Sequence, residues 1–177
     1  MTRHEPPQPS IGRIPTFTAH PLVVGITEDP APVLVAAAES LAQALGSPRL
    51  CFAFADPARY VIEEDPDGSV RHAAIDPDAD DDVHERSDSI RTALSSLLHT
   101  EGWEFHYLAG RPDRALTHLA RAVDASMIMV GTRGPGLAEH LRESLRGPVG
   151  THLSQHQHRP VVTVPLGVVD WQDPVAL

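Results

Sequence analysis

The chain has 177 residues, of which 41% are hydrophobic and 21% charged, and its formal net charge is −10 at pH 7. This length and composition are typical of one globular domain with a buried core. Because no run of about 18 apolar residues occurs, and because so acidic a chain repels polyanions, we expect neither a membrane-spanning helix nor a nucleic-acid partner.

Neither end of the chain has the apolar pattern of a helix or strand that packs on a core. Residues 1–19 are rich in proline and polar residues without a continuous apolar segment, which predicts a flexible tail and argues against a secretory signal. Residues 168–177 are a second predicted tail, so the folded domain is expected over 20–167. The single Cys51 cannot form an internal disulfide and lies in an apolar run, as expected of a reduced core thiol in a cytoplasmic protein.

The first part of the chain predicts a strand, a helix and a second strand. Residues 21–27 and 50–55 are short continuous apolar runs, the pattern of strands that are covered on both faces. Between them, apolar residues recur at helical spacing up to Gly46. Asp29 followed by Pro30 predicts an N-cap with proline at the first helical position. Together these elements predict a βαβ unit with a right-handed crossover.

The middle of the chain carries most of the negative charge. Residues 59–90 contain eleven acidic residues and three arginines. Residues 59–64 and 69–75 flank an Asp-Pro-Asp-Gly sequence, so we expect an acidic hairpin insertion over 59–83. The aspartates of 76–82 begin like a calcium-binding EF-hand loop but lack its glycine and its final glutamate, which favours a solvated acidic loop.

The second half of the chain returns to alternating helices and strands. Apolar spacing predicts helices over 86–100, from 110 onward and over 148–157. The apolar runs that predict strands are 103–108, 126–130 and 160–164. We therefore predict an α/β fold: an open, parallel, five-stranded sheet with helices on both faces, plus the inserted hairpin.

The glycines that follow the fourth strand of this sheet are the strongest candidates for ligand contact. Ligands bind such sheets beyond the carboxyl ends of the strands, where the strand order reverses, so the loops after Thr27 and Gly131 are expected to line a crevice. Gly131, Gly134 and Gly147 would let backbone amides approach a phosphate, although loops also need glycines for turns. A G-x-G-x-x-G turn does not follow the first strand, and no P-loop motif occurs, which disfavours a Rossmann site and excludes a P-loop.

Several segments resemble the universal stress protein family. Residues 110–134 (GRPDRALTHLARAVDASMIMVGTRG) are similar to the family's G-x-P-x-x-A-L-x-x-x-A run and the glycine loop that follows it. Residues 147–153 and 158–165 resemble the family's last helix and strand, and the whole resemblance covers about 21–56 and 103–165. It implies an adenine nucleotide alpha hydrolase-like fold with strand order 3-2-1-4-5, commonly a homodimer, and often ATP at the point where the order reverses.

The resemblance also implies a nucleotide site, from which this chain departs. Nucleotide-binding members have G-x-x-G, nine residues and then G-S/T, whereas twelve residues separate Gly134 from Gly147 here and Pro148 replaces the Ser or Thr. Proline has neither a hydroxyl nor an N–H, so two phosphate donors are lost there, although proline suits a first helical turn. The family's acid after the first strand falls on Thr27, and its adenine-contacting residue falls on Phe54. The residues expected at the nucleotide are Ile26, Thr27, Phe54, Val130, Gly131, Arg133, Gly134, Gly147, Pro148 and Val149.

Other residues offer weaker chemistry. Arg133 either faces a phosphate or is a solvated loop arginine. His152 and His156 lie four residues apart on a predicted helix, with His158 close behind, but no cysteine or well-spaced acid accompanies them and we expect no metal site. We assign no nucleophile and no general base, so the sequence predicts no enzyme.

The last predicted strand would lie at the edge of the sheet. Its residues are Val161, Val162, Thr163 and Val164. An apolar edge needs a cover, and the resemblance implies pairing with the same strand of a second subunit, although a buried strand without dimerisation would also explain the valines.

The resulting hypothesis is a cytoplasmic, non-enzymatic, homodimeric module of the stress response. It would bind ATP or another adenine nucleotide in a modified site, with Mg²⁺ present only when nucleotide is bound. The alternative is a dimeric interaction protein of the same fold that binds no nucleotide and works through its dimer surface and the acidic segment.

Overall fold

The computed structural model describes residues 12, 16–18, 20–46, 49–76, 82–132 and 149–167. Most of the first expected tail, all of the second and residues 77–81 of the acidic loop lie outside the described residues. No helix within the described ranges is long and apolar enough to cross a membrane.

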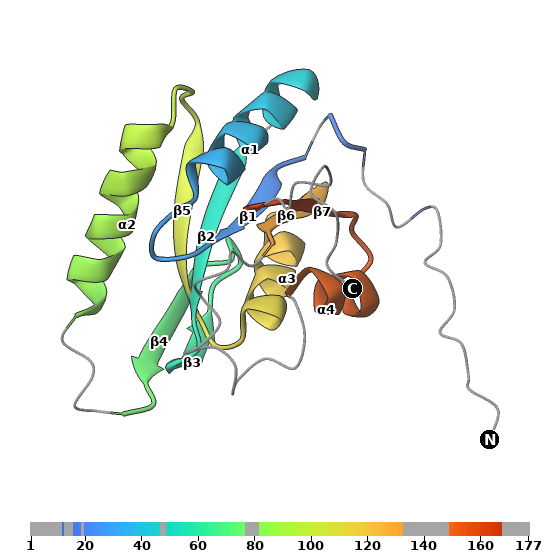
Figure 1. The fold of residues 1–177 in the computed structure, drawn as a ribbon. Helices are drawn as coiled ribbons and strands as arrows, with labels where there is room; N and C mark the ends of the chain where they lie inside the picture. Colours follow the sequence, from blue (N-terminus) through green and yellow to red (C-terminus); the bar gives the residue numbers. More distant parts are fainter. Residues whose placement is uncertain are drawn as a thin grey trace, which may run out of the picture.

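Five parallel strands form the central sheet (Figure 1). They are β1 (Leu22–Ile26), β2 (Leu50–Asp56), β5 (Trp103–Ala109), β6 (Met127–Gly131) and β7 (Val161–Val164). Their order is β5-β2-β1-β6-β7, which confirms the predicted order 3-2-1-4-5 once the hairpin strands are left out of the count.

Helices cover both faces of the sheet, as predicted. They are α1 (Pro32–Ala44), α2 (Val83–Leu97), α3 (Pro112–Ala122) and α4 (Val149–His156). Alternate strand residues point to opposite faces, so Val24 and Phe52 pack with α1 and α2 while Val23 and Cys51 pack with α3 and α4. The continuous apolar runs of the strands therefore supply two cores, one on each face.

The inserted hairpin is formed by β3 (Arg59–Glu64) and β4 (Val70–Ala74), which pair antiparallel. Gly68 in its turn lies against Leu119 of α3, on one face of the sheet. The ring of His72 in β4 lies 5.4 Å from the ring of Tyr107, whose side chain packs on the other face. The hairpin therefore wraps around the carboxyl half of the edge strand β5.

The boundaries of two helices, α1 and α2, differ from the sequence prediction. The prediction that Asp29 caps α1 is wrong, because the N-cap is Ala31 and Pro32 takes the first turn. Asp29 instead stays in the preceding loop, where its carbonyl oxygen accepts a hydrogen bond from the Thr27 hydroxyl at 2.7 Å. Helix α2 also begins earlier than expected and ends at Leu97, because Leu98 is extended.

Candidate functional site

The strand order reverses between β1 and β6. The chain runs from β1 to β2 and β5 on one side, then returns across β1 to add β6 and β7 on the other. Helices α1 and α4, which follow β1 and β6 in the chain, pack on opposite faces of the sheet. In such sheets ligands bind in the crevice beyond the strand ends at this point, and the sequence predicts a site there.

The predicted strand residues of the site lie in two neighbouring rows across the sheet. Ile26 is the partner of Phe54, and Gly25 is the partner of Val130, so Ile26 lies beside Gly131 at the ends of their strands. The side chains of Ile26, Phe54 and Val130 are only 8%, 8% and 4% exposed. They belong to the two cores, and a ligand in the crevice would meet the backbone and loops above them.

Gly131 has a packing role in the structure. A Cβ atom at this position would lie 2.6 Å from Leu166 Cδ1. The Thr132 amide donates a hydrogen bond to the Val164 carbonyl oxygen, and the Leu166 amide donates one to Thr132 Oγ1. The chain that leaves β7 is thereby fastened over the end of β6, and Leu166 fills the space above Gly131.

The far wall of the predicted site is only partly described. Arg133, Gly134, Gly147 and Pro148 lie outside the described residues. Val149 is the first residue of α4, and a Cβ atom at Gly150 would lie 3.6 Å from Val130. The first turn of α4 is therefore packed on the end of β6, beside the crevice.

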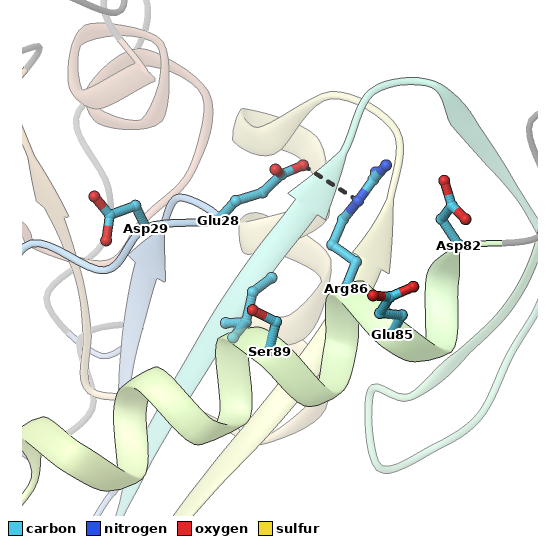
Figure 2. Close-up of a pocket in the computed structure, with 7 residues that line it drawn as sticks. Glu28, Asp29, Asp82, Glu85, Arg86 and Ser89 are labelled. Atoms are coloured by element: carbon cyan, nitrogen blue, oxygen red, sulfur yellow. Dashed lines mark ion pairs between the residues drawn. The ribbon is translucent and has the colours of Figure 1, made fainter.

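A surface pocket of about 460 Å³ lies on the other side of the crevice, between the loop after β1 and the first turns of α2 (Figure 2). Its lining residues are Glu28, Asp29, Asp82, Glu85, Arg86, Ser89 and Ile90. Four of these carry carboxylates and only one is cationic, so the pocket is acidic. Figure 2 shows Glu28 and Arg86 pointing toward one another.

Arg86 is held by acids on two strand ends. Its Nη1 atom lies 3.0 Å from Asp56 Oδ2, and its Nε atom lies 3.4 Å from Glu28 Oε1. The Tyr107 hydroxyl donates a second hydrogen bond to Asp56 Oδ2 at 2.8 Å. Burial and the Asp56 carboxylate raise the pKa of Tyr107 to about 12. Burial lowers the pKa of Arg86, but Tyr107 and the neighbouring carboxylates outweigh it, so this pKa is raised and the guanidinium stays charged.

Local sequence patterns did not predict this Arg86 network. The available signal was the acid Asp56 directly after an apolar run; in the structure it is 4% exposed, and a buried acid needs a partner. Its partners come from a helix and another strand that are distant in sequence.

The histidines of α4 form no metal group with other described residues. His152 and His156 stack on one another, with ring centroids 5.8 Å apart, and His156 Nδ1 lies 2.9 Å from the His152 carbonyl oxygen. The group of described side chains that could hold a metal lies elsewhere and consists of Cys51, Glu104 and His106.

Comparisons with known proteins agree with this architecture. The model of the universal stress protein family matches residues 19–165. No curated protein matched the chain. Among solved structures, a universal stress protein in complex with cAMP is 22% identical with a TM-score of 0.54, covering 85% of this chain and 99% of that one. A universal stress protein from Archaeoglobus fulgidus is 18% identical with a TM-score of 0.53, covering 82% and 98%. At these identities the two structures show a common fold.

Proposed function

The chain belongs to the universal stress protein family, and from this premise we propose that it binds an adenine nucleotide in the crevice beyond β1 and β6. It would act in a stress response through that binding, without catalysis. The observation that carries the proposal is the reversal of strand order at β1 and β6, with Thr27 and Gly131 on its two sides. The solved structure of a universal stress protein in complex with cAMP adds support, since a protein of similar fold binds an adenine nucleotide.

The charges around the crevice support one orientation of the nucleotide. Glu28 and Asp29 are exposed and follow β1, and Asp82 and Glu85 add two more acids to the pocket. Carboxylates accept hydrogen bonds from hydroxyl and amino groups but repel phosphates. We therefore propose that the ribose or base lies toward the acidic pocket and the phosphate toward the start of α4, where helix N–H groups favour anions. Mg²⁺ would enter only with the nucleotide.

The binding experiment uses ATP, ADP, AMP and cAMP, each with and without Mg²⁺. Heat in a calorimetric titration and a rise in melting temperature are the expected results, because a ligand that binds only the folded state stabilises it by mass action. If none of the four nucleotides gives heat or a shift at millimolar concentration, nucleotide binding is refuted.

A pair of matched variants locates the site. Thr27 and Thr92 are both exposed, and each hydroxyl bonds a nearby backbone carbonyl oxygen. Thr27→Glu places a carboxylate where the family has an acid, on the side proposed for the ribose or base. It should strengthen nucleotide binding about tenfold, because a carboxylate accepts hydrogen bonds from hydroxyl or amino groups. Thr92→Glu places the same charge on α2 away from the crevice and should leave binding unchanged. Equal affinities in the two variants would mean that the nucleotide binds elsewhere.

We also propose that the protein is a cytoplasmic homodimer joined through β7. This strand ends the sheet order. The carbonyl oxygens of Pro160 and Val164 accept hydrogen bonds from Ile128 and Thr132, on the β6 side. Because backbone groups alternate along a strand, those of Val161 and Thr163 face away from β6 and are available to a second copy.

A protein-binding role without nucleotide is the second candidate function. The observation that favours it is a set of exposed apolar side chains on the hairpin and just after it. These are Tyr60 (52% exposed), Val61 (44%), Ile62 (55%) and Ile75 (66%). A protein that ignores all four nucleotides, and loses a protein partner when Ile62 is changed to Ser, would fit this function instead.

A further inference from the structure

Three side chains with metal-binding donor atoms meet on β2 and its neighbour β5. Cys51 is the direct cross-strand partner of Glu104, and Ala53 is the partner of His106. Glu104 and His106 are two residues apart on one strand and therefore point to the same face. From this convergence we propose that Cys51, Glu104 and His106 form a binding site for a transition-metal dication such as Zn²⁺.

The distances between the donor atoms fit one small ion. Cys51 Sγ lies 3.9 Å from Glu104 Oε2, and His106 Nε2 lies 3.6 Å from the same oxygen. All three donor atoms lie within 4.8 Å of one another. Around a tetrahedral Zn²⁺ with bonds of about 2.0–2.3 Å, such atoms are about 3.3–3.5 Å apart. Shifts of a few tenths of an ångström would bring Glu104 Oε2 to that spacing from both partners, while Cys51 Sγ and His106 Nε2, within 4.8 Å of one another, must approach by up to about 1.3 Å.

One nitrogen atom of the group lacks a hydrogen-bond partner among the described residues. His106 Nε2 is buried and has no hydrogen-bond partner among the described residues, since the nearest Glu104 oxygen is just beyond hydrogen-bond distance. A buried polar atom without a partner destabilises the fold and requires an explanation. A metal ion would accept the imidazole lone pair and remove that cost.

Arg49 orients the carboxylate of the group. Its Nη1 atom lies 3.1 Å from Glu104 Oε1, which leaves Oε2 facing Cys51 and His106. Residues that hold a metal ligand from behind in this way are a regular feature of metal sites. Cys51 is fully buried and the His106 side chain is 12% exposed, but Glu104 is 43% exposed. The ion would therefore enter past Glu104.

The donor set selects the kind of metal. One sulfur, one imidazole nitrogen and one carboxylate oxygen suit Zn²⁺ or Co²⁺, whereas Mg²⁺ and Ca²⁺ prefer oxygen alone. Binding converts the thiol to a thiolate, with its proton released to solvent, so a thiolate and a carboxylate together neutralise the dication. Three protein ligands leave the fourth position to water.

Cobalt provides a direct test, because Cys51 is the only cysteine in the chain. The full-length protein is freed of metal with a chelator and titrated with Co²⁺ alone, and then with Zn²⁺. We expect one equivalent of Co²⁺ to produce a thiolate-to-cobalt charge-transfer band with tetrahedral ligand-field bands, and Zn²⁺ to abolish both. Bound cobalt without the thiolate band would overturn the proposal.

Variants separate the ligands from surface histidines. Cys51→Ala and His106→Gln should each weaken Zn²⁺ binding by at least about 100-fold, and Arg49→Gln by about tenfold. His156→Gln, which changes an exposed histidine of α4, is the matched control for His106→Gln and should bind as the wild type does. Tight binding by Cys51→Ala, or equal losses in both histidine variants, would contradict the site. If a variant fails to fold, the cobalt spectrum of the wild type decides alone.

Discussion

Glu39 is an acidic residue that is buried among the apolar residues of α1, with 7% of its surface exposed. Its Oε1 atom accepts hydrogen bonds from the backbone amides of His99 and Thr100, at 2.7 and 2.9 Å. These amides follow the end of α2, where no helix or strand provides partners for them. Glu39 therefore satisfies the backbone of a connection that is distant in sequence, and it ties α1 to that connection.

We predict that removing this carboxylate changes both stability and its dependence on pH. Glu39→Ala should cost about 2 kcal/mol in the free energy of unfolding, because the His99 and Thr100 amides and the Thr100 hydroxyl lose their acceptor. Burial raises the pKa of Glu39, but the hydrogen bonds from His99 and Thr100 outweigh it, and the pKa lies below its ordinary value of 4.5. Its stabilisation is therefore present above the pKa of the unfolded carboxyl and is lost as pH falls through the folded value.

Urea denaturation at several pH values measures both effects. Glu39→Gln should flatten the loss of stability in acid relative to the wild type, while the exposed Glu101→Gln serves as the control. If Glu39→Gln loses as much unfolding free energy at low pH as the wild type, Glu39 does not contribute to the acid dependence of stability.

Tyr107 provides a second prediction at the residue scale. Its raised pKa of about 12 means that one of the two tyrosines should ionise late in an alkaline absorbance titration. Because the folded pKa lies above the unfolded value of about 10, this stabilisation is complete below pH about 10 and is lost as pH rises toward 12. Asp56→Asn should move the late step to lower pH, and Tyr107→Phe should remove it. A late step that survives in Tyr107→Phe would show that another group titrates there.

At the scale of elements, Gly68 in the hairpin turn and Gly102 between α2 and β5 form a matched pair. Gly68 and Gly102 both have φ of +84°, which favours glycine. A Cβ atom at Gly68 would lie 2.7 Å from Leu119 Cδ1, whereas at Gly102 nothing lies within 4 Å. Gly102→Ala should therefore cost about 1–2 kcal/mol from backbone strain alone.

Gly68→Ala should lower the free energy of unfolding by about 1–3 kcal/mol more than Gly102→Ala does, because the hairpin must also move away from α3. Thermal or urea denaturation of both variants gives the difference directly. Equal costs would show that the hairpin turn is not packed on α3.

Periodicity predicted the elements well, and their order followed from the resemblance to the family. Sequence pattern could not choose where α1 begins, because Pro30 and Pro32 are both suitable for a first turn and the Thr27–Asp29 contact decides between them. Side-chain pairs between distant elements were also beyond prediction. The register that sets Cys51 opposite Glu104 depends on how β2 and β5 align, which no local spacing reveals.

At the scale of the whole molecule, the homodimer is the main prediction. Thr163→Pro removes an N–H that faces away from β6 and leaves the β6–β7 hydrogen bonds in place. We expect light scattering with size exclusion to find the wild type dimeric and Thr163→Pro monomeric, while Thr163→Val, which keeps the N–H, stays dimeric. A monomeric wild type at all concentrations, or a dimeric Thr163→Pro, would rule out pairing through β7.

The hairpin has a consequence for how large an assembly can grow. Strands β5 and β7 are the two ends of the sheet, but the hairpin wraps the carboxyl half of β5 and leaves β7 uncovered by any other described strand (Figure 1). A sheet with two exposed edge strands can pair with further copies at both edges and grow without limit. A sheet with one covered edge stops growing once its exposed edge strand has paired with a second copy. The acidic insertion would thus prevent strand pairing at β5, so that self-association stops at a dimer and does not continue into a fibre.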